Sequence, residues 1–74
     1  MTTLEHLNAV LSMHVEPPRE LDAALALGSF ELVIVCEALE EAFNIHITAA
    51  DVTHEHFGTL RRLLALVELK QATP

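Results

Sequence analysis

The chain has 74 residues, 51% of them hydrophobic, and a formal net charge of -7 from 11 acidic residues against 4 Lys and Arg. This length provides for a single domain, residues 1–74, around one core, and the apolar content excludes a disordered segment. The acidic charge and the absence of Trp and Tyr argue against nucleic acid or an anionic membrane as a partner and favour partners with basic surfaces.

The first expected helix opens at Thr2, which has the spacing of a capping box with Glu5. Apolar residues then recur at helical spacing, at Leu4, Leu7, Val10 and Leu11. The pair Pro17-Pro18 ends this helix and begins a loop over residues 16–28. The loop is long for so small a domain, and its leucines are expected to pack over the core.

Residues 29–43 form the strongest predicted helix. The run 33–36 could also form a strand, but the helix-forming residues 37–42 decide for a helix. The expected buried face contains Leu32, Val33, Val35, Cys36, Leu39 and Phe43. The expected opposite side contains Glu37, Glu40 and Glu41, with Ile34 between the two sides.

The remainder of the chain predicts shorter elements. Residues 44–47 read as an extended link, and Thr48 begins a helical turn or two. Residues 54–58 read as a connection, after which Thr59 caps a last helix with a frayed tail at 70–74. The predicted fold is all-α: a small antiparallel bundle of three main helices plus one short helix, with a long first loop.

The spacing after Ser29 carries a family resemblance. Ser29 is followed nine residues on by Ala38-Leu39-Glu40-Glu41-Ala42-Phe43, and Phe57-Gly58-Thr59-Leu60 lies further along. This pattern resembles the acyl carrier protein family, including its peptidyl and aminoacyl carriers. In that family the second helix begins at a serine that bears 4'-phosphopantetheine, usually within Asp-Ser-Leu. The resemblance implies a phosphoprotein that holds an acyl or aminoacyl group as a thioester on an arm at Ser29.

The resemblance also implies a docking face on the helix that follows Ser29. This face contains Phe30, Glu31, Val33, Ile34, Glu37, Glu40 and Glu41. The implied partners are a phosphopantetheinyl transferase, an acyl- or aminoacyl-loading enzyme, and ketosynthase or tailoring enzymes of polyketide, fatty-acid-like or other specialised metabolism. The chain itself is then not an enzyme. In the family, an acidic residue before the serine helps the transferase to dock, whereas this chain has Gly28 there.

Other interpretations of these residues stay open. Ser29 alone is equally compatible with a plain helix cap. Because Gly28 replaces the acidic residue, an alternative function is a carrier-fold helical interaction module without the arm. We also expect a cytoplasmic chain, because the N-terminal residues lack a signal segment and no apolar run approaches the ~18 residues of a membrane span. We expect the free chain to be monomeric.

Three histidines could suggest a zinc site. His54 and His56 flank Glu55, and His46 is near in sequence, but no second cluster has matching spacing. We therefore predict solvent-facing histidines and no metal site. Cys36 is expected to be a small buried hydrophobe. Arg61 and Arg62 are expected either to bind acidic residues of a neighbouring helix or to be exposed.

Overall fold

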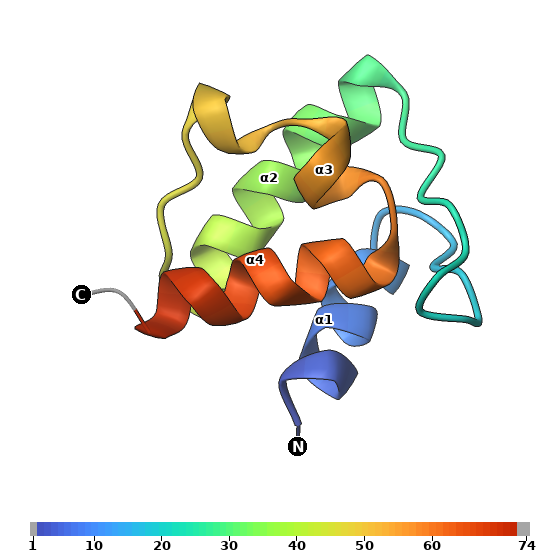
Figure 1. The fold of residues 1–74 in the computed structure, drawn as a ribbon, viewed down its shortest axis with the longest axis horizontal. Coiled ribbons are helices and arrows are strands. Elements are labelled where there is room, and N and C mark those ends of the chain that lie inside the picture. The colour runs from blue at the N-terminus through green and yellow to red at the C-terminus, as the bar shows by residue number, and fades with distance from the viewer. Residues whose placement is uncertain (1, 73–74) are drawn as a thin grey trace.

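The computed structural model describes residues 2–72, and these residues form helices and loops without a strand (Figure 1). In chain order the elements are α1 (Thr3–Ser12), α2 (Ser29–Phe43), the 3-10 turn η1 (Ala49–Asp51), α3 (His54–Phe57) and α4 (Leu60–Ala72). The prediction of an all-α fold is therefore confirmed.

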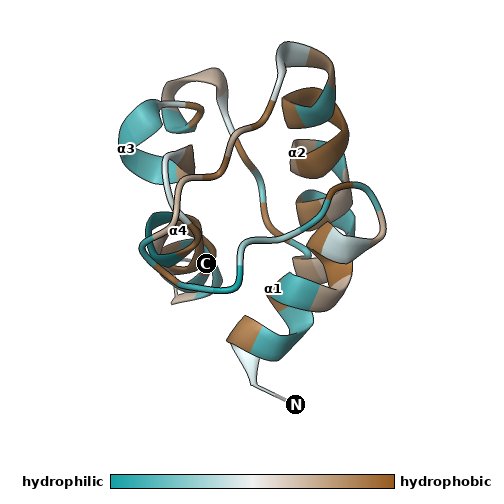
Figure 2. Cartoon of the chain, turned by 90° about the vertical axis from the view of Figure 1, so that its right-hand side faces the viewer, coloured by the Kyte–Doolittle hydropathy of each residue, from teal (hydrophilic) through white to brown (hydrophobic). Residues whose placement is uncertain are grey.

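One hydrophobic core joins the helices. Its buried side chains are Leu7, Val10, Leu11, Val35, Leu39, Phe43, Phe57, Leu60, Leu63, Leu66 and Val67. They come from α1, α2, α3 and α4, so each helix contributes apolar surface that it could not bury alone. Figure 2 shows hydrophobic residues along much of α2, on more than one side of the helix.

Side chains cap the helices where the sequence predicts it. The Thr2 hydroxyl accepts a hydrogen bond from the Glu5 N–H at 3.1 Å, and the Glu5 carboxylate accepts one from the Thr2 N–H at 3.0 Å. The Thr59 hydroxyl accepts a hydrogen bond from the Arg62 N–H at 3.1 Å at the start of α4. These contacts confirm the predicted capping box and the predicted cap of the last helix.

Two predicted boundaries are wrong. Residues 54–58 do not form a plain connection, because the Thr53 hydroxyl caps the short helix α3 and Phe57 is buried in the core. The last helix also does not fray at residue 70. It continues to Ala72, and the Lys70 ammonium lies 2.7 Å from a carboxylate oxygen of Asp51. Residues 73 and 74 of the predicted tail lie outside the described residues.

The first loop is fastened to the corner between α3 and α4. The Leu25 N–H donates to the Gly58 carbonyl at 2.9 Å, and the Arg61 N–H donates to the Leu21 carbonyl at 2.8 Å. The Arg61 guanidinium also binds the Asp22 carboxylate at 2.6 Å. Loop leucines 21, 25 and 27 pack against the core, as predicted. The loop therefore holds the start of α2 in a defined position.

Candidate functional site at the start of α2

Ser29 is the first helical residue of α2 and is exposed. The cap position belongs to Gly28, whose backbone is extended at φ -73° and ψ 168°. The interpretation of Ser29 as a plain helix cap is therefore wrong, because the helix begins one residue too early for it. Within residues 2–72 the Ser29 hydroxyl has no hydrogen-bond partner.

Glu31 shapes the mouth of the helix. A carboxylate oxygen of Glu31 accepts a hydrogen bond from the Gly28 N–H at 3.0 Å, which brings its negative charge back beside the cap. The N–H groups of Ser29, Phe30 and Glu31 have no acceptor among the described residues, and the Leu32 N–H donates to the Gly28 carbonyl at 2.8 Å. Free N–H groups at the positive end of a helix dipole favour an anionic group.

The exposed side of α2 carries apolar and acidic residues together. Phe30 is 78% exposed, and Ile34, Glu37 and Glu41 follow it at helical spacing, with Ile34 partly buried and both glutamates exposed. We call these four residues the α2 strip. Val33 lies beside the strip and is 58% exposed. Its prediction as a buried residue is wrong, because α2 is apolar on so many sides that periodicity alone does not locate the core face.

Glu40 is not part of this strip. One carboxylate oxygen of Glu40 accepts a hydrogen bond from the Ile47 N–H at 2.9 Å and lies 3.4 Å from the His46 ring nitrogen Nδ1. The Glu40 carboxylate thereby fastens residues 44–47, the link after α2, to the helix. Of the acidic residues expected on the docking face, the structure brings Glu37 and Glu41 together and places Glu40 apart from them.

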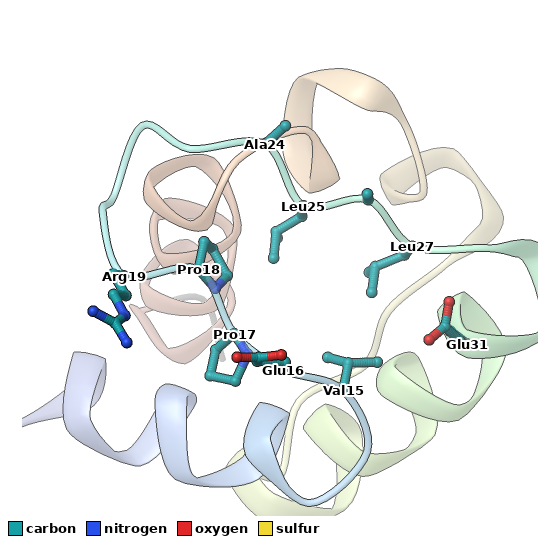
Figure 3. A pocket seen from close by; sticks show the side chains of 10 residues that line it. Val15, Glu16, Pro17, Pro18, Arg19, Ala24, Leu25, Leu27 and Glu31 are labelled. Atoms are coloured by element: carbon teal, nitrogen blue, oxygen red, sulfur yellow. The ribbon is translucent and has the colours of Figure 1, made fainter.

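Two shallow grooves flank the start of α2. The larger, of about 390 Å³, has the apolar side chains of Val15, Leu25 and Leu27 between Arg19 and Glu31, which lie at opposite ends (Figure 3). The smaller, of about 230 Å³, lies between the first loop and α3 and includes Leu27 and Leu32, on either side of Ser29 in the chain. Apolar surface is thus available close in sequence to the Ser29 hydroxyl.

The other residues considered from the sequence fall elsewhere. His46 and His54 are exposed as predicted, whereas His56 is partly buried. No three His, Cys, Asp or Glu side chains in the described part of the chain gather in a metal-binding group. Cys36 is half-buried, and this burial, with a smaller contribution from the Glu40 charge, raises the pKa of its thiol. Arg61 binds Asp22 of the first loop rather than an acid of a neighbouring helix, and both Arg61 and Arg62 are exposed, which confirms the second of the two expectations for this pair.

Sequence reasoning did not single out Met13, which is 78% exposed just beyond the end of α1. No signal in the apolar spacing identifies it, since it falls outside the helical period of α1.

Among residues 2–72, no helix is both long and apolar enough to cross a lipid bilayer. The start of α2 therefore presents the exposed Ser29 hydroxyl beside free backbone N–H groups, and the α2 strip follows along the helix. No protein-family model, no curated protein and no solved structure matches this chain.

Proposed function

We propose that this protein is a carrier that holds an acyl or aminoacyl group on a 4'-phosphopantetheine arm attached to Ser29. The observation that carries the proposal is the exposed Ser29 hydroxyl, unbonded within the described residues, on the first residue of α2. The family resemblance of the sequence after Ser29 supports the same residue. The carrier itself catalyses nothing, and its partners perform the chemistry.

The surroundings of Ser29 suit a phosphodiester. In the attachment step the Ser29 oxygen bonds to the phosphorus that bears the pantetheine of coenzyme A, the pyrophosphate bond breaks, and 3',5'-adenosine diphosphate leaves. The hydroxyl proton passes to a base of the phosphopantetheinyl transferase. The N–H groups of Ser29 and Phe30 favour the resulting anionic group. When loaded, the arm supplies a thiol for the thioester, and tethering raises the local concentration of the cargo.

The α2 strip is the proposed docking face for the transferase, the loading enzyme and the ketosynthase or tailoring enzymes. Phe30 offers exposed apolar surface, and Glu37 and Glu41 offer negative charge one turn apart. Such a surface steers basic partners and mainly raises the association rate. We propose polyketide, fatty-acid-like or other specialised metabolism as the setting, from the resemblance alone.

Glu31 is proposed to replace the acidic residue that the family usually places before the serine. Its carboxylate binds the Gly28 N–H, so negative charge lies next to Ser29 although residue 28 is Gly. A Cβ on residue 28 would lie 3.4 Å from this carboxylate oxygen, in ordinary contact. The transferase can therefore meet an acid at the helix mouth from a different position in the sequence.

The decisive experiment is the intact mass of the purified chain after incubation with coenzyme A and a broad-specificity transferase. We expect one added phosphopantetheine on the wild-type chain and none on Ser29→Ala. Ser12→Ala is the matched control, because Ser12 is the other serine of the chain and its hydroxyl already donates to the Ala9 carbonyl. Addition that persists in Ser29→Ala, or no addition at all, refutes the proposed attachment site.

The role of Glu31 has its own test. In Glu31→Gln the amide oxygen can still accept the Gly28 hydrogen bond, so the variant removes charge while keeping the cap. We expect slower arm transfer at low salt and a smaller difference at high salt. Glu20→Gln, in the first loop and outside the lining of both grooves, serves as the control. Equal transfer rates for Glu31→Gln and wild type would remove Glu31 from transferase docking.

The second candidate function is a helical interaction module without the arm. The exposed Phe30 and Val33 on one helix favour it, since large apolar side chains gathered on a surface indicate a binding site. Absence of arm transfer, combined with a partner whose binding depends on Phe30, would support this function over the carrier.

A further inference from the structure

A third groove lies between the end of α1 and the second half of α2. It encloses about 360 Å³ and is lined by Val10, Met13, His14, Ala38, Glu41 and Ala42. We call it the α1–α2 groove. Met13, 78% exposed, forms part of its wall, and Glu41 is its acidic residue. The lining is otherwise mostly apolar, so an apolar side chain of a partner would be removed from water when it binds here.

The α1–α2 groove faces away from Ser29. Ala38 follows Ser29 by nine residues, which is about two and a half turns of an α-helix, so the two residues lie on opposite flanks of α2. Ala42 lies one turn beyond Ala38 on the same flank. A protein bound in this groove therefore leaves Ser29 itself uncovered, although Glu41 belongs both to the groove and to the α2 strip.

The carboxylates near this groove belong to α2. Neither α1 nor α2 contains a Lys or Arg, Glu31 and Glu40 are turned to Gly28 and Ile47, and His14 also lines the groove. Glu41 lines the groove and Glu37 lies one turn away on the same helix. An acidic partner would be repelled from this surface, and a basic one would be attracted.

We propose that the α1–α2 groove binds a basic amphipathic helix of a partner protein. An apolar side chain of that helix occupies the space between Met13 and the alanine pair 38 and 42, and its Lys or Arg residues lie beside Glu37 and Glu41. The small side chains of the alanine pair allow a helix to approach closely, and the flexible Met13 side chain adapts to the residue it meets. This docking site goes beyond the carrier function and does not require the arm.

The test uses the Ser29→Ala chain, so that it remains informative whether or not an arm is attached. The probe is an 18-residue peptide of Leu and Lys with Leu at helical positions i, i+3, i+4 and i+7. A matched peptide with Ser in place of Leu keeps the charge and removes the apolar face. Amide shifts of the 15N-labelled chain during titration locate the binding site, and fluorescence anisotropy of labelled peptide gives the affinity.

We expect the largest amide shifts at Val10, Met13, Ala38 and Ala42, with much weaker binding of the Ser peptide. Met13→Gln should lower the affinity for the Leu–Lys peptide by about tenfold, because the substitution removes a central apolar contact. Glu41→Gln should slow association at low salt, whereas Glu55→Gln, in α3 and outside the groove lining, should not.

Three outcomes would overturn the proposal. The first is a set of shifts centred on Phe30 and Val33, which would place the peptide beside Ser29. The second is equal affinity of Met13→Gln and the unsubstituted chain. The third is sedimentation showing a concentration-dependent dimer that Met13→Gln dissociates, which would make a second copy of the chain the occupant. A failure to attach the arm to wild type would refute only the carrier function.

Discussion

Gly58→Ala is expected to destabilise the protein, although the backbone at this position favours the substitution. Gly58 has φ -73° and ψ -31°, values that alanine adopts without strain. Replacing Gly by Ala at such a position reduces the conformational entropy of the unfolded chain and by itself stabilises by about 0.4–1 kcal/mol. The sign of the total effect therefore depends on whether the folded protein has space for a methyl group.

The structure leaves no such space. A Cβ on residue 58 would clash with the His54 carbonyl oxygen and would lie 2.9 and 3.0 Å from two atoms of the His54 ring. The ring can rotate away, but the carbonyl belongs to the backbone of α3 and moves only if the helix moves. Overpacking of this kind costs about 1–3 kcal/mol. The cost exceeds the entropic gain, and we expect a net loss of about 1–2 kcal/mol.

This loss is measurable by thermal or urea unfolding. In a domain of this size, 1 kcal/mol shifts the melting temperature by about 4–8 °C. Gly28→Ala is the matched control, because a Cβ there meets its nearest atom at 3.4 Å, an ordinary contact, and the entropic gain roughly offsets the weaker cap. The Leu25 amide should also exchange faster in Gly58→Ala, because it donates to the Gly58 carbonyl. Wild-type stability of Gly58→Ala, or an equal loss in Gly28→Ala, would refute the steric argument.

Three further predictions concern the core, the link after α2 and acid stability. Leu39→Ala removes a fully buried side chain and should cost about 2–5 kcal/mol in urea unfolding, whereas Leu69→Ala, on a 58% exposed side chain, should cost much less. Glu40→Ala leaves the Ile47 N–H without its acceptor and should cost about 1 kcal/mol and speed Ile47 amide exchange, while Glu37→Ala should not. The Lys70 ammonium, together with hydrogen bonds from Thr48, lowers the pKa of Asp51 to about 2. The stabilisation that the Asp51 carboxylate provides is therefore present above about pH 4 and disappears as the pH falls toward 2. Calorimetry of Asp51→Asn should therefore show a smaller drop in melting temperature over this pH range, and an unchanged drop would contradict the assignment.

The sequence predicts the elements better than the contacts that connect them. Local signals are enough for the Thr2–Glu5 capping box and for the helix that follows Ser29, because capping and helix propensity act over a few residues. The Thr53 cap of α3 is also a local signal, and reading residues 54–58 as a connection overlooked it. By contrast, the Asp51–Lys70 ion pair joins residues that only the fold brings together.

The candidate site shows the same division. The sequence predicts a helix over residues 29–43, and α2 has these bounds, but the identity of the cap depends on where the chain leaves the first loop. The free hydroxyl and the Glu31–Gly28 hydrogen bond accompany a cap at Gly28 rather than at Ser29. For Val33 the sequence is ambiguous, because neighbouring positions 32–36 are all apolar and only packing decides which of them are buried.

The distribution of basic residues connects stability with the proposed docking surfaces. Of the four Lys and Arg residues, Arg61 and Lys70 bind Asp22 and Asp51 and thereby fasten the first loop and η1 to α4. These two basic residues of α4 therefore form ion pairs with the first loop and with η1, which have little regular structure. The side formed by α1 and α2 keeps its glutamates without Lys or Arg from either helix. These two helices therefore present an acidic surface in which Glu41 belongs both to the α2 strip, proposed for partners that act at Ser29, and to the α1–α2 groove.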